Sequence, residues 1–483
     1  MTRRRRPIVY AAAAWVMAVP AIALAHAFGE RYDLPVPLGY FVAGAAVAVV
    51  LSFAVAAIVM RGSSRTVPGE GIVFRVGAML PAARTACRIV SVGLLALVVY
   101  AGFAGTRNLE MNIAPTLVWL AWWVGLPLFA ACIGNIWPAL DPWRALFDGI
   151  NALARHAGAA RDISLGWTYP RTLGTWPAVA LLLAFVWLEV VYPYAAMPSH
   201  IAWMALAWSA LTMIGMTCFG ADTWQRHADV FAVYFRTLGR FAPLGPGPDE
   251  RTLVLRPPGR ALVAGETDSF AMAAFVLAML STLLFDGLLG TQVIVLVHTA
   301  LNIWMPSLVD SRGYFLGIVG MLGVWLFFLL AYLAACLATA RLLRNRSTGA
   351  VARLFALTLV PIVVAYNVAH NFYYLLVQGQ LLIPLASDPL GRGWNLFGTA
   401  NQLPDIGIVD ARLTWHVAIG AIVVGHVISI WLAHRVALRE AGTPRRAVAA
   451  SVPLTMLMVI YTVISLLVIA EPLVEFGDPT PPR

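Results

Sequence analysis

Long apolar segments alternate with short polar connections along the whole chain of 483 residues. An α-helix needs about 20 residues to cross roughly 30 Å of hydrocarbon, and eleven segments approach that length. They are residues 8–26, 36–60, 88–106, 114–136, 176–197, 201–221, 269–290, 314–340, 354–377, 413–433 and 449–470. The pattern predicts an all-α, polytopic transmembrane helix bundle with ten spans, preceded by an N-terminal signal peptide or anchor.

Arginine is concentrated in every second connection between these segments. Short loops that carry positive charge stay on the cytoplasmic side of a membrane, so these connections are expected inside. They contain the arginines of residues 3–6, 61–84, 144–171, 226–260, 341–353 and 435–446. The alternation does not break along the chain, and it places the C-terminus on the periplasmic side.

Two shorter patterns predict helices that do not span the membrane. Residues 293–305 are apolar but too short to cross, and counting them as a span would invert every later arginine-rich loop. We therefore expect a re-entrant or surface helix on the outer side. Residues 143–160 alternate apolar and polar side chains at helical spacing, as in a helix that lies on the membrane surface.

The segments divide the chain into four regions. These are a signal peptide or first anchor at 1–25, a first helix group at 26–221, a cytoplasmic loop at 222–268, and a second helix group at 269–483 with a periplasmic loop at 378–412. The cytoplasmic loop contains Pro-Leu-Gly-Pro-Gly-Pro, a composition typical of a flexible connection.

Composition excludes several classes of protein. The chain is 60% hydrophobic and 12% charged, with a mean hydropathy of +0.80, whereas soluble domains have about 25% charged residues. The net charge of +10 comes from dispersed arginines, which indicates membrane topology and not a nucleic-acid surface. The chain has no lysine, so Schiff-base chemistry has no residue to use. We expect the protein to lie in the lipid bilayer of the bacterial inner membrane.

The N-terminus is compatible with two interpretations. Arg3 to Arg6, an apolar run and Ala23-Leu24-Ala25 have the layout of a cleavable signal peptide. Cleavage after Ala25 would make His26 the mature N-terminus, whose amino group and imidazole form a chelate suited to copper. Without cleavage the segment is an anchor, and His26 lies in a polar outer turn.

Ionisable side chains within the apolar segments are costly to bury and are therefore candidates for function. The candidate catalytic residues are Glu189, Asp286, His370 and His426, and the candidate metal ligands are His370, His426, His298 and His26. On the predicted topology most of the buried candidates face the outer half of the membrane. Together they can bind a divalent metal, act as general acid and base, or relay protons. The alternative is that each only ties helices together by hydrogen bonds.

A polar stripe surrounds one of these candidates. Asn367, His370, Asn371 and Tyr374 are separated by three, four and seven residues, which places them on one helical face. Such a face must contact protein or water. The loop after this helix, Ser387 to Gly398, is rich in glycine and aromatic residues. It suits a loop over a pocket mouth, or equally an interfacial turn anchored by a tryptophan.

Several stretches together carry a resemblance to a known family. They are residues 26–35, 119–125, 135–138, 141–143, 240–243, 364–370, 387–397, 425–426 and 433–434. With these stretches the chain resembles the bacterial polytopic membrane proteins named fenitrothion hydrolase, a family of membrane-bound organophosphorus hydrolases. The resemblance implies hydrolysis of an apolar phosphorothioate triester at its aryl ester bond. Such a reaction needs an activated water and an electrophile for the charge on phosphorus, and for this role we expect a divalent metal on His370, with His426, Glu189 or Asp286 as a further ligand or base.

Two other classes of function fit the same sequence. The polar residues could line the route of a permease, or of a protein that handles metals, with an outward-facing site. Alternatively, the surface helix at 143–160 could hold a partner in an assembly or scaffold component. Interrupted helices at matching positions in the two groups would favour transport. A dead-end pocket that opens only to the outside would favour an enzyme or receptor.

Overall fold

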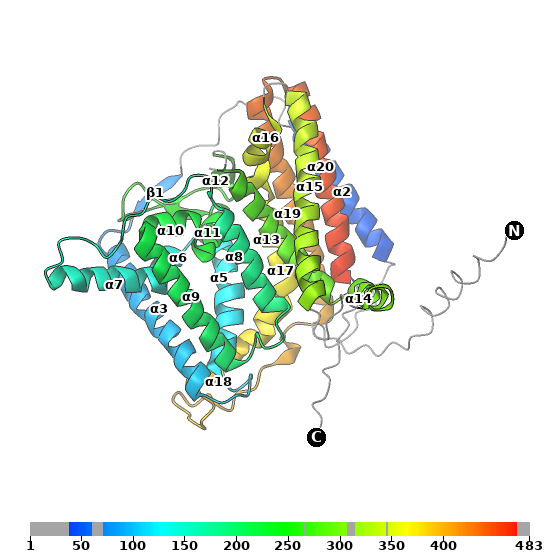
Figure 1. The fold of residues 1–483 in the computed structure, drawn as a ribbon. Coiled ribbons are helices and arrows are strands. Elements are labelled where there is room, and N and C mark those ends of the chain that lie inside the picture. The colour runs from blue at the N-terminus through cyan, green and yellow to red at the C-terminus, as the bar shows by residue number, and fades with distance from the viewer. Residues whose placement is uncertain are drawn as a thin grey trace.

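The computed structural model describes residues 38–59, 71–264, 267, 269–306, 314–343 and 346–470, and within these ranges the chain is almost entirely helical (Figure 1). The ten apolar segments predicted inside these ranges all form helices. The segment at 8–26, the question of cleavage and His26 lie outside the described residues.

The first helix group ends before the long connection at 222–268. It contains α2 (Leu38–Val59), α3 (Met79–Ala104), α4 (Ile113–Pro115), η2 (Thr116–Gly125), α5 (Leu126–Cys132), α6 (Trp137–Leu140), α7 (Pro142–His156), α8 (Trp176–Val190) and α9 (Pro198–Phe219). The amphipathic helix expected at 143–160 is present as α7. Helix α8 has only 15 residues, so it is shorter than the span predicted there.

The second group follows from residue 270. It contains α13 (Phe270–Leu289), α14 (Gln292–Trp304), α15 (Tyr314–Leu343), α16 (Thr348–Phe355), η4 (Ala356–Leu359), α17 (Val360–Val377), η5 (Gln378–Leu381), α18 (Leu382–Ser387), η6 (Ile406–Ile408), α19 (Ala411–Ala441) and α20 (Pro444–Ala470). In the described part of the chain, nine helices from the two groups are long and apolar enough to cross a membrane. The protein is therefore a multi-pass membrane protein.

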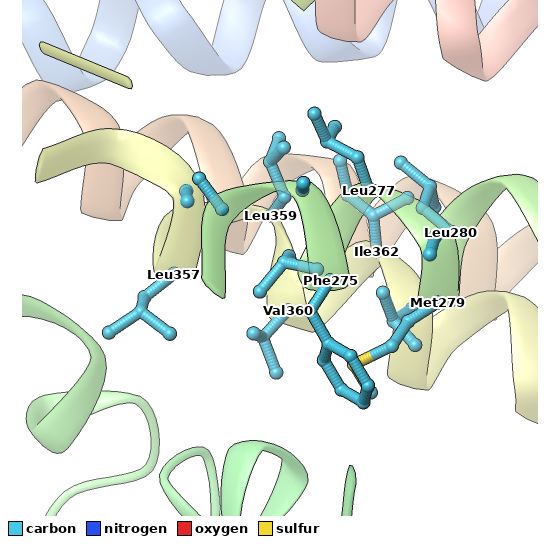
Figure 2. Close-up of a cluster of buried hydrophobic side chains, with 14 of the residues drawn as sticks. Phe275, Leu277, Met279, Leu280, Leu357, Leu359, Val360 and Ile362 are labelled. Atoms are coloured by element: carbon cyan, nitrogen blue, oxygen red, sulfur yellow. The ribbon is translucent and has the colours of Figure 1, made fainter. Parts of the chain in front are cut away.

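The centre of the bundle is the packing of α13 against η4 and α17. Figure 2 shows Phe275, Met279 and Leu280 of α13 close to Val360 and Ile362 of α17, and all of these side chains are buried. Helix α13 is buried along almost its whole length, whereas α14 has no buried residue. Helix α14 lies across the bundle near the lower ends of α15 and α20 (Figure 1) and is too short to span, as expected for residues 293–305.

Polar side chains at the ends of the apolar segments determine where the helices begin. Ser269 accepts a hydrogen bond from the backbone N–H of Met272 at the start of α13, and Asp410 accepts one from Leu413 at the start of α19. Such caps satisfy N–H groups that have no partner within the helix. The change from polar connection to apolar run therefore predicts the start of these helices closely.

The segment η2 is a π-helix of ten residues, Thr116–Gly125. At its end the N–H of Leu126 donates to the carbonyl of Ala121, five residues earlier, instead of four. π-Helical turns are rare and are frequently found at functional sites. This wider helix carries Trp119, Trp122 and Trp123.

The connection at 222–268 is folded, contrary to the flexible loop that its Pro-Gly run suggests. It contains α10 (Ala221–His227), α11 (Val230–Gly239), β2 (Leu244–Pro246), β3 (Thr252–Leu255) and α12 (Arg260–Val263). Strand β1 (Ile72–Arg75) comes from the earlier arginine-rich connection and pairs with β3, in a three-stranded antiparallel sheet of order β1-β3-β2. Helix α11 is buried over nearly its whole length.

The described arginine-rich connections meet at one end of the bundle. The pairing of β1 with β3 joins two of them, and Arg439 donates to the carbonyl of Val263 from a third. Thr267 likewise bonds to the carbonyl of Arg353. Figure 1 shows β1, α12 and α16 at this same end. The arrangement agrees with the alternation of charge predicted from the sequence.

Two buried carboxylates start helices in this region. Asp141 caps α7 and Asp229 caps α11, and neither side chain is exposed. Asp141 also accepts a hydrogen bond from Gln225, whereas Oδ2 of Asp229 has no partner among the described residues. Burial, together with the nearby Asp141 carboxylate, raises the pKa of Asp229 to about 7.

This pKa predicts that the protein loses stability as the pH rises. An unfolded aspartate has a pKa of about 4, so the raised value means that the folded state binds the proton more tightly. The contribution is complete below about pH 4 and is lost as the pH rises through about 7. Asp229→Asn keeps the helix cap and removes the charge, so it should flatten this dependence.

The measurement is the thermal unfolding temperature of the detergent-solubilised protein across this pH range. Asp410→Asn, at the exposed cap of α19, is the matched control and should keep the wild-type slope. An unchanged slope in Asp229→Asn would show that this carboxylate does not control the pH dependence.

Candidate functional site

The candidate site is built around an ion pair between α13 and α17. Nε2 of His370 lies 2.9 Å from Oδ2 of Asp286, and the two side chains are 30% and 35% exposed. Asp286 is three residues from the end of α13, about 5 Å along the helix axis, on the side opposite to the arginine-rich end. The pair therefore lies in the half of the bundle away from the arginine-rich end, which is the half predicted to face outside, and it is partly exposed.

A second carboxylate lies next to the pair. Glu189, in the last turn of α8, interacts electrostatically with Asp286 and is a hydrogen-bond partner of the Trp123 indole. Tyr374, one turn beyond His370 on α17, also interacts with Glu189. Two carboxylates that interact within one site repel each other when both are charged, and a proton on either one relieves the repulsion. The site is therefore suited to hold and transfer a proton.

Two further tyrosines extend the cluster. The Tyr366 ring stacks near the His370 ring, with a centroid distance of 6.2 Å and an interplanar angle of 20°. Its hydroxyl is buried and has no hydrogen-bond partner among the described residues. Tyr234 reaches the site from α11, where its hydroxyl is a hydrogen-bond partner of Asn367 and interacts with Glu189.

The structure thus brings together three of the predicted residues, Glu189, Asp286 and His370, and adds three that the sequence did not indicate as site residues. Trp123, Tyr234 and Tyr366 were missed because aromatic residues in apolar surroundings are typical of packing. Their only signal is polar chemistry at the tip of the ring: a buried tryptophan or tyrosine usually finds a hydrogen-bond partner.

His426 is buried in α19, away from this cluster. Gly425 lies so close to Pro361 and Ala365 that a Cβ at this position would clash with them, so these residues define the face of α17 that packs on α19. Ala365 and His370 are five residues apart, or about 140° around the helix. His370 therefore points away from α19, and Nδ1 of His426 contacts the carbonyl of Ile422 at 2.8 Å.

The remaining candidate ligands do not join the ion pair. His298 is on α14, which has no buried residue, and His26 lies outside the described residues. Within the described ranges there is no group of three His, Cys, Asp or Glu side chains that could hold a metal ion. The residues gathered here fit acid–base chemistry, and the placement of His370, His298 and His426 gives no support to a shared metal.

The loop after α17 lies over the ends of α3 and α4. Leu390 accepts a hydrogen bond from the N–H of Thr106, and Arg392 donates to the carbonyl of Ala104. The loop is internally fixed by Asp388, whose carboxylate accepts from the N–H groups of Arg392 and Gly393. It is an ordered cover for the outer end of the first helix group.

Comparisons with protein-family models, with curated proteins and with solved structures find no match to the chain.

The packing beneath the ion pair gives a prediction. A Cβ at Gly287, the residue after Asp286, would lie 2.7 Å from the Tyr366 hydroxyl and 2.9 Å from Cγ1 of Val468. Overpacking of this kind costs about 1–3 kcal/mol. Gly287→Ala should therefore lower the thermal unfolding temperature in detergent. The control is Gly323→Ala in α15, where the new methyl group would meet nothing within 4 Å; equal effects of the two changes would contradict the packing described.

Proposed function

We propose that the protein is an integral membrane hydrolase of apolar organophosphorus triesters in the bacterial inner membrane. The observation that supports this proposal is the contact of His370 with Asp286, together with a second, half-buried carboxylate, Glu189, that interacts with Asp286. A histidine oriented by a carboxylate is the arrangement that activates water or a hydroxyl group in many hydrolases. The resemblance to the fenitrothion hydrolases supplies the substrate class.

The geometry assigns a role to each member of the pair. Asp286 accepts a hydrogen bond from Nε2–H of His370 and so fixes the tautomer, which leaves Nδ1 as the basic nitrogen. Nδ1 takes a proton from a water molecule while the oxygen of that water forms a bond to phosphorus. The bond from phosphorus to the aryl oxygen breaks, and the leaving phenolate is protonated by imidazolium or solvent.

The tyrosines and Glu189 complete the site. We assign the unpartnered Tyr366 hydroxyl, whose ring stacks near His370, as a donor that stabilises negative charge developing on the phosphoryl group. Glu189, held by Trp123, adds a second carboxylate that interacts with Asp286.

The location also suits an apolar substrate. Such a molecule partitions into the bilayer and can approach the outer half of the bundle from the lipid. The ion pair is partly exposed, so the substrate does not need to cross the packed core around α13.

The test is nitrophenol release from fenitrothion by the purified protein in detergent. We expect His370→Gln and Asp286→Asn to lower the rate by about 10²–10⁴-fold, the usual contribution of general acid–base catalysis. His426→Gln, a matched change of a buried histidine on the other face, should retain the wild-type rate. Absence of nitrophenol release by folded wild-type protein, or an unaffected rate in His370→Gln, would reject the proposal.

A second candidate function is proton-coupled transport. If the short α8 is counted as a span, each helix group has five spans, and the third of each is irregular: η2 interrupts residues 113–132, and η4 precedes α17. These two helices pack against each other at the site, and irregular helices at corresponding positions of two halves are a feature of transporters. Proton movement into protein-containing liposomes that is lost in Asp286→Asn, without nitrophenol release, would favour transport over hydrolysis.

A further inference from the structure

An apolar chamber of about 480 Å³ lies within the first helix group. One wall is formed by α3 and α9, which pack on each other along their length. The opposite wall is formed by η2 and α8. Ligand pockets in proteins generally measure about 300–1,000 Å³, so the chamber is large enough for a substantial part of a small molecule or lipid.

Both ends of the chamber are closed by packed side chains. At the end near the arginine-rich connections its lining includes Trp137, Trp143 and Phe231, whose rings pack together. At the outer end Val98 and Ile201 line it, and these residues join an apolar cluster with Leu385 and Leu390 of the loop after α17. The loop thus covers this chamber.

The chamber has its opening at the side. Helices α8 and α9 follow each other in sequence, yet they do not pack together along their length. Ala184 of α8 and both Ala207 and Leu211 of α9 line the chamber and remain exposed. A lateral opening between these two helices faces the hydrocarbon region of the membrane.

Neither a water-filled nor an empty state of the chamber is favourable. The lining is almost entirely aliphatic and aromatic, and water molecules need two to four polar partners to occupy a cavity. An apolar cavity that stays empty destabilises the protein in proportion to its volume. An apolar molecule from the surrounding bilayer satisfies both conditions.

We propose that the chamber binds one acyl chain of a membrane lipid, which enters between α8 and α9. The lining residues of α9 run from Ile201 to Leu211, about 15 Å at 1.5 Å per residue. The chamber is therefore elongated along the helices, in the direction of the chains of the bilayer, and lipid is the apolar molecule always present at its opening. The proposal does not depend on the hydrolase activity.

The bound chain would lie beside the candidate site. Phe185 lines the chamber and packs against Trp123, with ring centroids 4.5 Å apart. Trp123 is the hydrogen-bond partner of Glu189. A filled chamber therefore supports this tryptophan through Phe185.

The test uses the full-length protein in nanodiscs that contain a phospholipid with a diazirine in the middle of one acyl chain. After photolysis, peptide mapping should find adducts on chamber residues such as Leu188 and Met204. Ala184→Phe and Ala205→Phe, on opposite walls, fill the space and should remove these adducts. Ala210→Phe, exposed on α9 but outside the chamber, should leave them unchanged.

Native mass spectrometry of the detergent-purified protein provides a second measurement. The wild type and Ala210→Phe should retain one more tightly bound lipid per chain than the two filled variants. Adducts confined to the outward faces of the helices, or equal lipid retention in all variants, would overturn the proposal. The proposal would also be overturned if the chamber retained no lipid but bound an aromatic compound, and if Ala184→Phe abolished that binding.

Discussion

The arrangement of this protein depends on the absence of hydrogen-bond partners in hydrocarbon. Every backbone N–H and C=O group at membrane depth must be satisfied within the chain, and even the irregular η2 keeps its hydrogen bonds inside one helix. The same constraint acts on side chains. Glu189, Asp286, His370 and Tyr234 come from four different helices, and they meet because none of them can be placed against lipid without a large cost.

The sequence identifies the residues that are costly to place against lipid, but it does not identify the residues that they contact in the folded protein. Glu189, Asp286 and His370 stand out because each is ionisable within an apolar segment. The contact of α13 with α17, however, is a property of tertiary packing, and the hydrophobic pattern is the same whichever helices are adjacent. His426 was grouped with His370 for this reason. The close packing at Gly425 instead turns His370 away from α19.

The least accurate part of the prediction is the connection at 222–268. The Pro-Gly run covers only residues 243–248, but it led to the prediction of a flexible loop for the whole connection. The ten-residue apolar helix α11, which precedes the run, was therefore not predicted. Helix α11 is too short for a span and lies beside arginines, so the pattern alone favours a loop. Its burial follows from contacts with α5 and α8. Tyr234 reaches the site through them.

The π-helix η2 also makes the site sensitive to the number of residues in the chain. A π-helical turn accommodates an extra residue compared with an α-helix, and each residue of an α-helix corresponds to a rotation of about 100°. Deletion of one residue between Thr116 and Gly125 would therefore let this segment relax and would turn the tryptophans on one side of the deletion to a different face. The length of this segment, as much as its composition, decides which ring faces Glu189, so insertions and deletions here are subject to a constraint that substitutions do not reveal.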